Sequence, residues 1–179
     1  MKKVVLTFGL LSGAVVTGLM FMTLPFAERI GFDRAVYVGY TTILISMLFV
    51  YFGVRSYRDN VLGGQMSFGT GFTAGLLITL VSSACYVASW LVMYYGFMDG
   101  FGERYAAYIV ESAQARGASQ AEIDVALQQG RDAIAMLDNP LINAAVSFTE
   151  PIPVGLLVTL ISATALRTKA PKAPAPEAP

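Results

Sequence analysis

The sequence predicts an all-α integral membrane protein with four transmembrane helices and an external amphipathic helical hairpin between helices 3 and 4. The first supporting observation is the composition. Of all residues, 55% are hydrophobic and only 13% are charged, whereas soluble domains carry about 25% charged residues. The second is that four apolar segments reach the roughly 20 residues that a spanning helix needs. The third is a helical periodicity in the polar segment that separates the last two of them.

The predicted transmembrane helices lie at about residues 4–24, 35–54, 72–95 and 141–166. Lys2 and Lys3 before the first helix resemble the basic start of a signal peptide. The apolar run that follows them is, however, longer than the ~7–15 residues found in such peptides. We therefore expect this segment to be retained as a membrane helix.

The distribution of Lys and Arg predicts the orientation in the membrane. Seven basic residues flank the helices on the side of the two termini, against five on the side of the long loop. Because basic residues favour the cytoplasmic side, both termini are expected there. Residues 1–166 then form a single membrane domain, and the Pro-rich residues 167–179 are expected to be a disordered cytoplasmic tail.

The long loop at residues 99–139 carries the signals of two helices. Gly117 is a natural helix stop, and Ser119 with Glu122 forms a capping box at which a second helix begins. The residues after it recur at spacings of 4 and 3, typical of an amphipathic helix: Ile123, Leu127, Gly130, Ile134 and Leu137. We expect a helical hairpin at the outer face of the membrane, and a solvated loop with fluctuating helices is the alternative.

Several classes of activity are disfavoured by residues that the sequence lacks. There is no histidine, which removes Ser-His and Cys-His nucleophile pairs and the usual histidine-containing zinc sites. The single cysteine, Cys85, lies in an apolar run and cannot form an intrachain disulfide. No basic stripe with interleaved aromatic residues points to nucleic acid. We expect no cofactor, no metal, no nucleic-acid partner and no enzymatic activity.

Small residues recur every four positions in the third and fourth predicted helices, where they let helix backbones approach closely. The helix-packing candidates are Gly71, Gly75, Thr79, Gly155 and Thr159. Residues 67–84 also align with residues 147–164 at an offset of 80, with eight of eighteen positions identical. An inverted duplication and a chance similarity between apolar helices both fit this alignment.

Glu150, Pro151 and Pro153 form the candidate functional group at the start of the last apolar segment. A proline lacks an amide proton and interrupts the hydrogen bond to the carbonyl four residues earlier, which would free the Ser147 and Thr149 carbonyls. One interpretation is a proton- or ion-responsive site beside a kink. The other is a carboxylate at the positive end of a helix that begins near Pro151.

Arg55 and Arg58 follow the second predicted helix and are the remaining candidate functional residues. They could bind anionic lipid head groups or a protein partner. The other interpretation is that they stop translocation and set the topology.

Three motifs carry a family resemblance: FVYFGVRSYRDN at 49–60, Asn139-Pro140, and FTEPIPVGL at 148–156. With them, the chain resembles an uncharacterised bacterial family of four-helix membrane proteins, domain of unknown function 4199. The resemblance covers nearly the whole chain except the Pro-rich tail. It implies a small protein of the bacterial inner membrane and supplies no activity or catalytic residue.

The expected function is therefore that of a non-enzymatic membrane component that packs with a copy of itself or with a membrane-protein partner. It would contact the lipid bilayer, and it would bind its protein partner through the small-residue rows and the outer hairpin. The alternative is a small transporter or proton- or ion-coupled carrier that uses Glu150.

Overall fold

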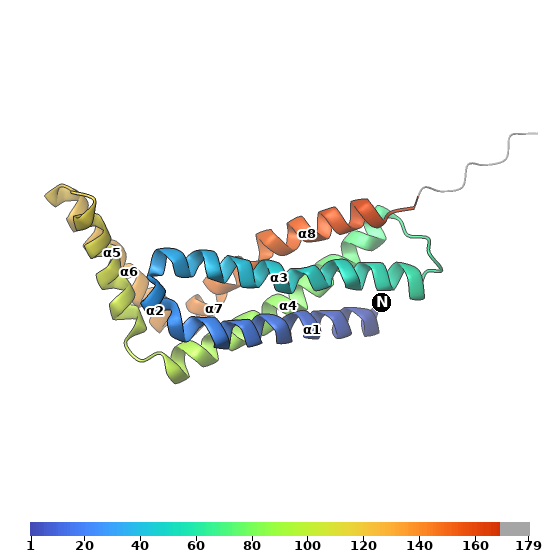
Figure 1. Cartoon of the computed structure of the whole chain (residues 1–179), viewed down its shortest axis with the longest axis horizontal. Helices are drawn as coiled ribbons and strands as arrows, with labels where there is room; N and C mark the ends of the chain where they lie inside the picture. The colour runs from blue at the N-terminus through green and yellow to red at the C-terminus, as the bar shows by residue number, and fades with distance from the viewer. Residues whose placement is uncertain (169–179) are drawn as a thin grey trace, which may run out of the picture.

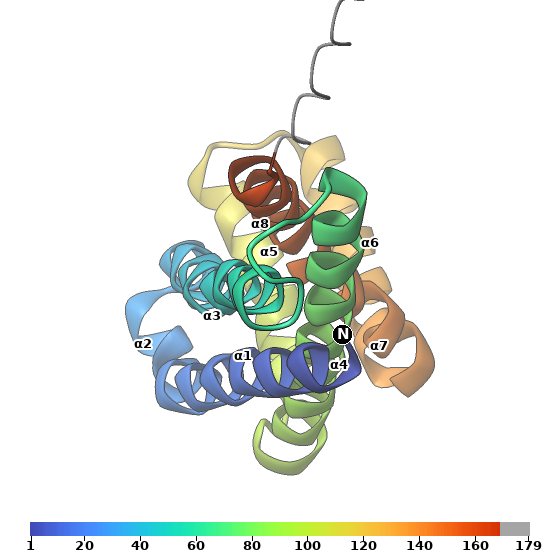
Figure 2. The same ribbon diagram turned by 90° about the vertical axis from the view of Figure 1, so that its right-hand side faces the viewer.

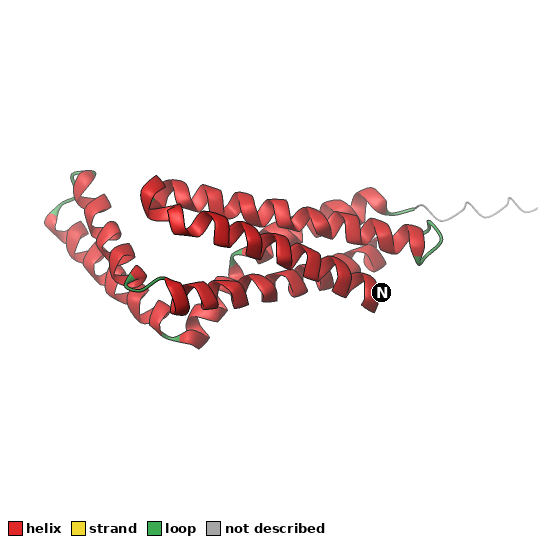
Figure 3. Ribbon diagram, turned by 60° about the horizontal axis from the view of Figure 1, so that its bottom comes forward, coloured by secondary structure: helices red, strands yellow, loops and turns green. Residues whose placement is uncertain are grey.

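The computed structural model describes residues 1–168, and within that range every regular element is a helix (Figure 3). Four helical stretches are long and apolar enough to cross a membrane, which confirms that part of the prediction: Lys2–Phe26, Phe32–Asn60, Phe68–Phe97 and Pro140–Leu166. Each stretch extends past the predicted segment by between one and nine residues, and the extension is longest at residues 55–60, where charged and polar residues continue the helix. Most of the predicted tail, residues 169–179, lies outside the described residues.

The helices follow one another through short connections. The first stretch contains α1 (Lys2–Thr23) and the 3-10 turn η1 (Leu24–Phe26). The short helix α2 (Ala27–Ile30) then leads into α3 (Phe32–Asn60). The remaining helices are α4 (Phe68–Phe97), α5 (Phe101–Ala115), α6 (Gln120–Asp138), α7 (Pro140–Thr149) and α8 (Pro151–Leu166). The fourth predicted helix is thus two helices that meet at Glu150.

The N-terminus and the end of α8 lie at the same end of the helix bundle, and α5 and α6 lie across the opposite end (Figure 1). The helix α4 runs obliquely and packs against both α1 and α8 (Figures 1 and 2). The helix α3 packs on the same two neighbours. Both α7 and α8 pack against α4, so the α7–α8 junction lies beside α4.

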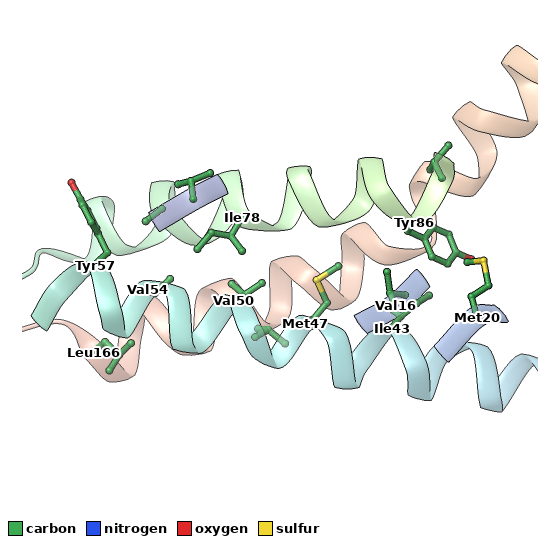
Figure 4. Close-up of a cluster of buried hydrophobic side chains, with 14 of the residues drawn as sticks. Val16, Met20, Ile43, Met47, Val50, Val54, Tyr57, Ile78, Tyr86 and Leu166 are labelled. Atoms are coloured by element: carbon green, nitrogen blue, oxygen red, sulfur yellow. The ribbon is translucent and has the colours of Figure 1, made fainter. Parts of the chain in front are cut away.

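The bundle interior is a row of apolar side chains that runs between the helices (Figure 4). Tyr57 and Leu166 lie at one end of this row, and Met20 and Tyr86 lie at the other. Polar side chains add hydrogen bonds where the helices come closest. The buried Ser12 hydroxyl of α1 donates to the Ser46 carbonyl of α3 at 2.7 Å and lies 2.7 Å from the Ser82 hydroxyl of α4.

The predicted helix-packing residues meet one another in the contact between α4 and α8. A Cβ atom added to Gly75 would approach the Thr159 side chain to 2.9 Å, and one added to Gly155 would overlap the Thr79 side chain. Gly71 faces Ala163 in the same contact. These residues are therefore packed inside one chain and do not form an outer surface for a partner.

Helices α5 and α6 pack against each other and against the end of the bundle. The helix α6 begins after Ser119, as the capping box predicts, and the Glu122 carboxylate accepts the Ser119 amide at 2.7 Å. From α4, the Tyr95 hydroxyl donates to the Leu137 carbonyl of α6 at 2.7 Å. From α5, the Tyr108 hydroxyl donates to Asp33 at the start of α3. The pair is thus attached to two helices of the bundle.

Candidate functional site

Glu150 occupies the junction between α7 and α8, where the hydrogen-bond ladder of the helix is interrupted. Its backbone remains helical, with φ −69° and ψ −51°. Pro151 and Pro153 supply no amide proton to the turn before them. The Ser147 carbonyl, which Pro151 leaves without its usual helical donor, instead accepts the Glu150 amide at 3.3 Å. The junction is therefore a tightened turn that joins two helices.

The Glu150 carboxylate is directed at α4. It makes no capping hydrogen bond to the first turn of α8. Instead, Glu150 Oε2 accepts a hydrogen bond from the Tyr86 hydroxyl of α4, whose side chain is 9% exposed. The side chain of Glu150 is thus positioned by a residue 64 positions earlier in the chain, although its backbone stands at the N-terminal end of a helix.

One turn along α4 from Tyr86, Trp90 makes a second polar link to α7. The Trp90 Nε1–H donates to Asn143 Oδ1 at 2.7 Å. Asn143 is only 2% exposed, and it also accepts the Ser147 hydroxyl at 3.1 Å and donates to the Leu137 carbonyl at 3.0 Å. Asn143, Ser147 and Glu150 therefore present one continuous polar face of α7 toward α4.

This polar face opens on two cavities that meet at Trp90 and Glu150. The larger cavity, about 490 Å³, is lined by residues of η1, α2, α3, α4 and α5 together with Glu150. The smaller, about 390 Å³, lies between α7 and the α5–α6 pair. Trp90, Phe101, Tyr105 and Glu150 line both. Glu150 therefore lines the cavities and is the only charged residue of the helical stretch Pro140–Leu166.

Aromatic rings from three helices form a continuous wall of the larger cavity. The Phe32 ring of α3 lies 5.8 Å from Phe101, 5.6 Å from Tyr105 and 5.0 Å from Tyr108, measured between ring centroids. Trp90 of α4 lies 5.9 Å from Phe101. These separations are those of favourable aromatic pairs, so the wall is held together by its own ring contacts.

Asp33 places a second carboxylate on the larger cavity. The Tyr108 hydroxyl donates to Asp33 Oδ1, and this bond raises the pKa of the Tyr108 phenol. Each carboxylate on the cavity is therefore held by a tyrosine hydroxyl from another helix. No lysine or arginine is among the residues that line either cavity. The site thus suits a ligand that is positively charged or rich in hydrogen-bond donors.

Residues 6–168 match the family described as protein of unknown function DUF4199. The chain belongs to this family. The resemblance carried by the three sequence motifs is thereby confirmed. Comparison with curated proteins gives no match, and comparison with solved structures gives none either. The function of this DUF4199 member must therefore be argued from the site.

Two of the other predicted functional residues of this DUF4199 chain lie far from the cavity. Arg55 and Arg58 are at the opposite end of α3 from Asp33. Both pair with Asp59, at 3.5 Å for Arg55 and 2.6 Å for Arg58. Of the predicted group, Glu150 lines the cavities, while Pro151 is buried and Pro153 is exposed at the start of α8.

Sequence reasoning missed the partners of Glu150. Aromatic residues near the end of a membrane helix, such as Tyr86 and Trp90, are common at membrane interfaces, and Asp33 lies in the short loop predicted between the first two helices. The spacing of Asn143, Ser147 and Glu150 by 4 and 3 residues is a signal for one polar helix face. Within the described residues, no group of three His, Cys, Asp or Glu side chains could hold a metal ion.

Proposed function

We propose that this protein is a non-enzymatic, multi-pass membrane protein that binds a small ligand in the cavities beside Glu150. The observation that carries the proposal is a carboxylate within an apolar helical stretch that accepts a hydrogen bond from Tyr86 and lines two cavities. An ionisable group at such a position is costly and usually serves function. A concave, mostly apolar site with a few convergent polar groups is typical of ligand binding.

The proposed topology places both termini in the cytoplasm of a bacterium and α5 and α6 outside its inner membrane. Its support is the seven-to-five distribution of basic residues, together with the common end of the bundle shared by the N-terminus and α8 (Figure 1). Cysteines introduced at Gln65 and Gln120 in a Cys85→Ala background test this. A membrane-impermeant thiol reagent should label only Gln120→Cys on intact cells, and labelling of Gln65→Cys would refute the orientation.

Ligand binding is tested by filling the larger cavity. Gly39 of α3 lines it, and a Cβ atom added there meets nothing within 4 Å. Gly39→Leu should therefore place a side chain in the cavity without disturbing the helix contacts. Gly18→Leu on α1 is the matched control, because its added Cβ also meets nothing within 4 Å and Gly18 does not line the cavities.

Both variants and the wild type are purified in native-membrane nanodiscs, and the small molecules that they retain are identified by mass spectrometry. A compound present with the wild type and Gly18→Leu should be lost from Gly39→Leu. The same compounds in equal amounts on all three proteins would contradict the proposal.

Carrier activity is the second candidate, and the broken helix at Glu150 favours it. Discontinuous membrane helices commonly form substrate and coupling-ion sites in transporters, and α7 and α8 meet in such a break. Glu150→Gln in proteoliposomes should then abolish a pH-driven uptake of the retained compound. Uptake at the wild-type rate would exclude a role for Glu150 in coupling.

A further inference from the structure

The larger cavity is unusually aromatic for a site that also holds charge. Seven of its fifteen lining residues are Phe, Tyr or Trp. The face of an aromatic ring carries partial negative charge, so a cation within about 6 Å of the ring centroid is attracted to it. The rings alone, among them Phe32, Trp90 and Tyr105, therefore favour a positively charged ligand.

The two carboxylates reinforce this preference from different helices. Glu150 at the α7–α8 junction and Asp33 at the start of α3 both line the larger cavity. Each accepts a tyrosine hydroxyl, from Tyr86 and Tyr108 respectively. No basic side chain lines the cavity to neutralise them. A positively charged ligand would therefore compensate the charge of the two carboxylates.

The remaining lining distinguishes an organic cation from a metal ion. A bare divalent cation needs about six or more oxygen ligands, and within residues 1–168 no group of three His, Cys, Asp or Glu side chains could hold a metal ion. Apolar side chains such as Leu24, Val36 and Ile43 complete the wall, and they would contact alkyl groups. A volume of about 490 Å³ also exceeds what a single ion would occupy.

We propose that the larger cavity binds a substituted ammonium ion, with its alkyl groups on the rings of Phe32, Trp90 and Tyr105 and its charge facing Glu150 and Asp33. This inference rests on the proposed function, because it names the ligand class of the same site. A free organic cation and the ammonium head group of a lipid share this chemistry.

Trp90 provides a specific reporter, since it is the single tryptophan of the chain and lines the cavity. The wild type in phosphatidylglycerol nanodiscs is titrated with choline and, separately, with 3,3-dimethylbutan-1-ol, its neutral isostere. Choline should change the Trp90 emission with an affinity at least about tenfold higher than that of the isostere. The reason is that desolvated cation–π and charge contacts contribute more free energy than a tenfold difference in affinity requires. Equal affinities for choline and its isostere would overturn the proposal of a cationic ligand, but not the proposal that the cavity binds a ligand.

Charge-removing variants test the two carboxylates separately. Glu150→Gln and Asp33→Asn should each weaken choline about tenfold and leave binding of the isostere unchanged. Asp132→Asn is the control, because Asp132 is exposed on α6 and accepts Gln128 rather than lining the cavity. Choline affinity that is unchanged in both cavity variants would overturn the assignment.

Two further comparisons show whether the ammonium group belongs to a lipid or to a free cation, and which of the two proposals fails if no response is seen. In phosphatidylcholine nanodiscs, a lipid ligand would shift Trp90 emission without added choline and suppress the choline response, whereas a free cation would titrate equally in both lipids. If neither choline nor lipid affects Trp90, yet Gly39→Leu loses a retained compound, the cation is overturned and the ligand-binding function stands. If Gly39→Leu retains everything as well, both proposals fail.

Discussion

Thr79 and Thr159 are 80 positions apart in the chain, and their hydroxyl oxygens face each other at 3.3 Å in the contact between α4 and α8. The offset equals that of the aligned stretches 67–84 and 147–164. Gly75 lies against Thr159, and its counterpart Gly155 lies against Thr79. The contact is thus reciprocal, which is the arrangement that a two-fold axis produces between equivalent surfaces.

The reciprocal contact predicts a large effect from a single added methyl group. Gly155→Ala should destabilise the fold by roughly 1–3 kcal/mol, the usual cost of overpacking a tight core, because the new Cβ overlaps the Thr79 side chain. Gly18→Ala should have little effect, since nothing lies within 4 Å of its added Cβ. Unfolding in mixed micelles, followed by Trp90 fluorescence, measures both. Equal stability of the two variants would contradict the packing described for Gly155.

The link between Tyr86 and Glu150 predicts that these residues act as a pair. Tyr86→Phe removes the hydroxyl that Glu150 accepts, and losing a hydrogen bond to a charged group costs about 1.5–3 kcal/mol. Glu150→Gln weakens the same bond. In a double-mutant cycle, the double variant should lose less free energy of unfolding than the two single losses added together. Strict additivity would mean that the two side chains are not coupled.

The fourth apolar stretch shows most clearly what could and could not be predicted from the sequence. Length and hydropathy were sufficient to predict a helical stretch at residues 141–166, and the structure has one at Pro140–Leu166. They were not sufficient to predict α7 as a separate helix. Asn139 caps α7 by accepting the Leu141 and Ile142 amides, while the prolines after Glu150 begin α8, so two start signals divide one apolar run.

The cavity could not be predicted from the sequence, because its parts are distant in the chain. Tyr86 and Glu150 are 64 residues apart, and Asp33 and Tyr108 are 75 apart. A row of small residues likewise indicates close packing but does not name the facing helix. Those pairings depend on how α4 crosses its neighbours, which local periodicity does not encode. What the sequence does carry of the site is local: the charge of Glu150 in an apolar run, and the spacing of Asn143, Ser147 and Glu150 on one helix face.

Asn143 is predicted to set the environment of Trp90. Asn143→Leu leaves the Trp90 Nε1–H and the Ser147 hydroxyl without their acceptor, and each unsatisfied buried group costs about 1–3 kcal/mol. The variant should therefore be less stable, and its emission should shift to shorter wavelength because the indole loses its polar neighbour. Asn60→Leu, at an exposed position, is the control. An unaltered emission spectrum in Asn143→Leu would exclude the hydrogen bond.

Tyr108 is predicted to titrate above the ordinary pKa of a tyrosine. Its hydrogen bond to Asp33 raises its pKa above the ordinary value of 10.0, because the bond favours the protonated phenol. A raised pKa in the folded state means that this link stabilises the attachment of α5 to α3 below the unfolded-state pKa. The stabilisation is lost as pH rises through the higher folded-state pKa.

The difference between the phenolate absorption titrations of the wild type and Tyr108→Phe isolates this one group. Its midpoint should lie above 10.0, and it should return toward that value when the same difference is measured in an Asp33→Ala background. A midpoint that Asp33→Ala leaves unmoved would show that burial alone, and not the bond between α5 and α3, shifts the phenol.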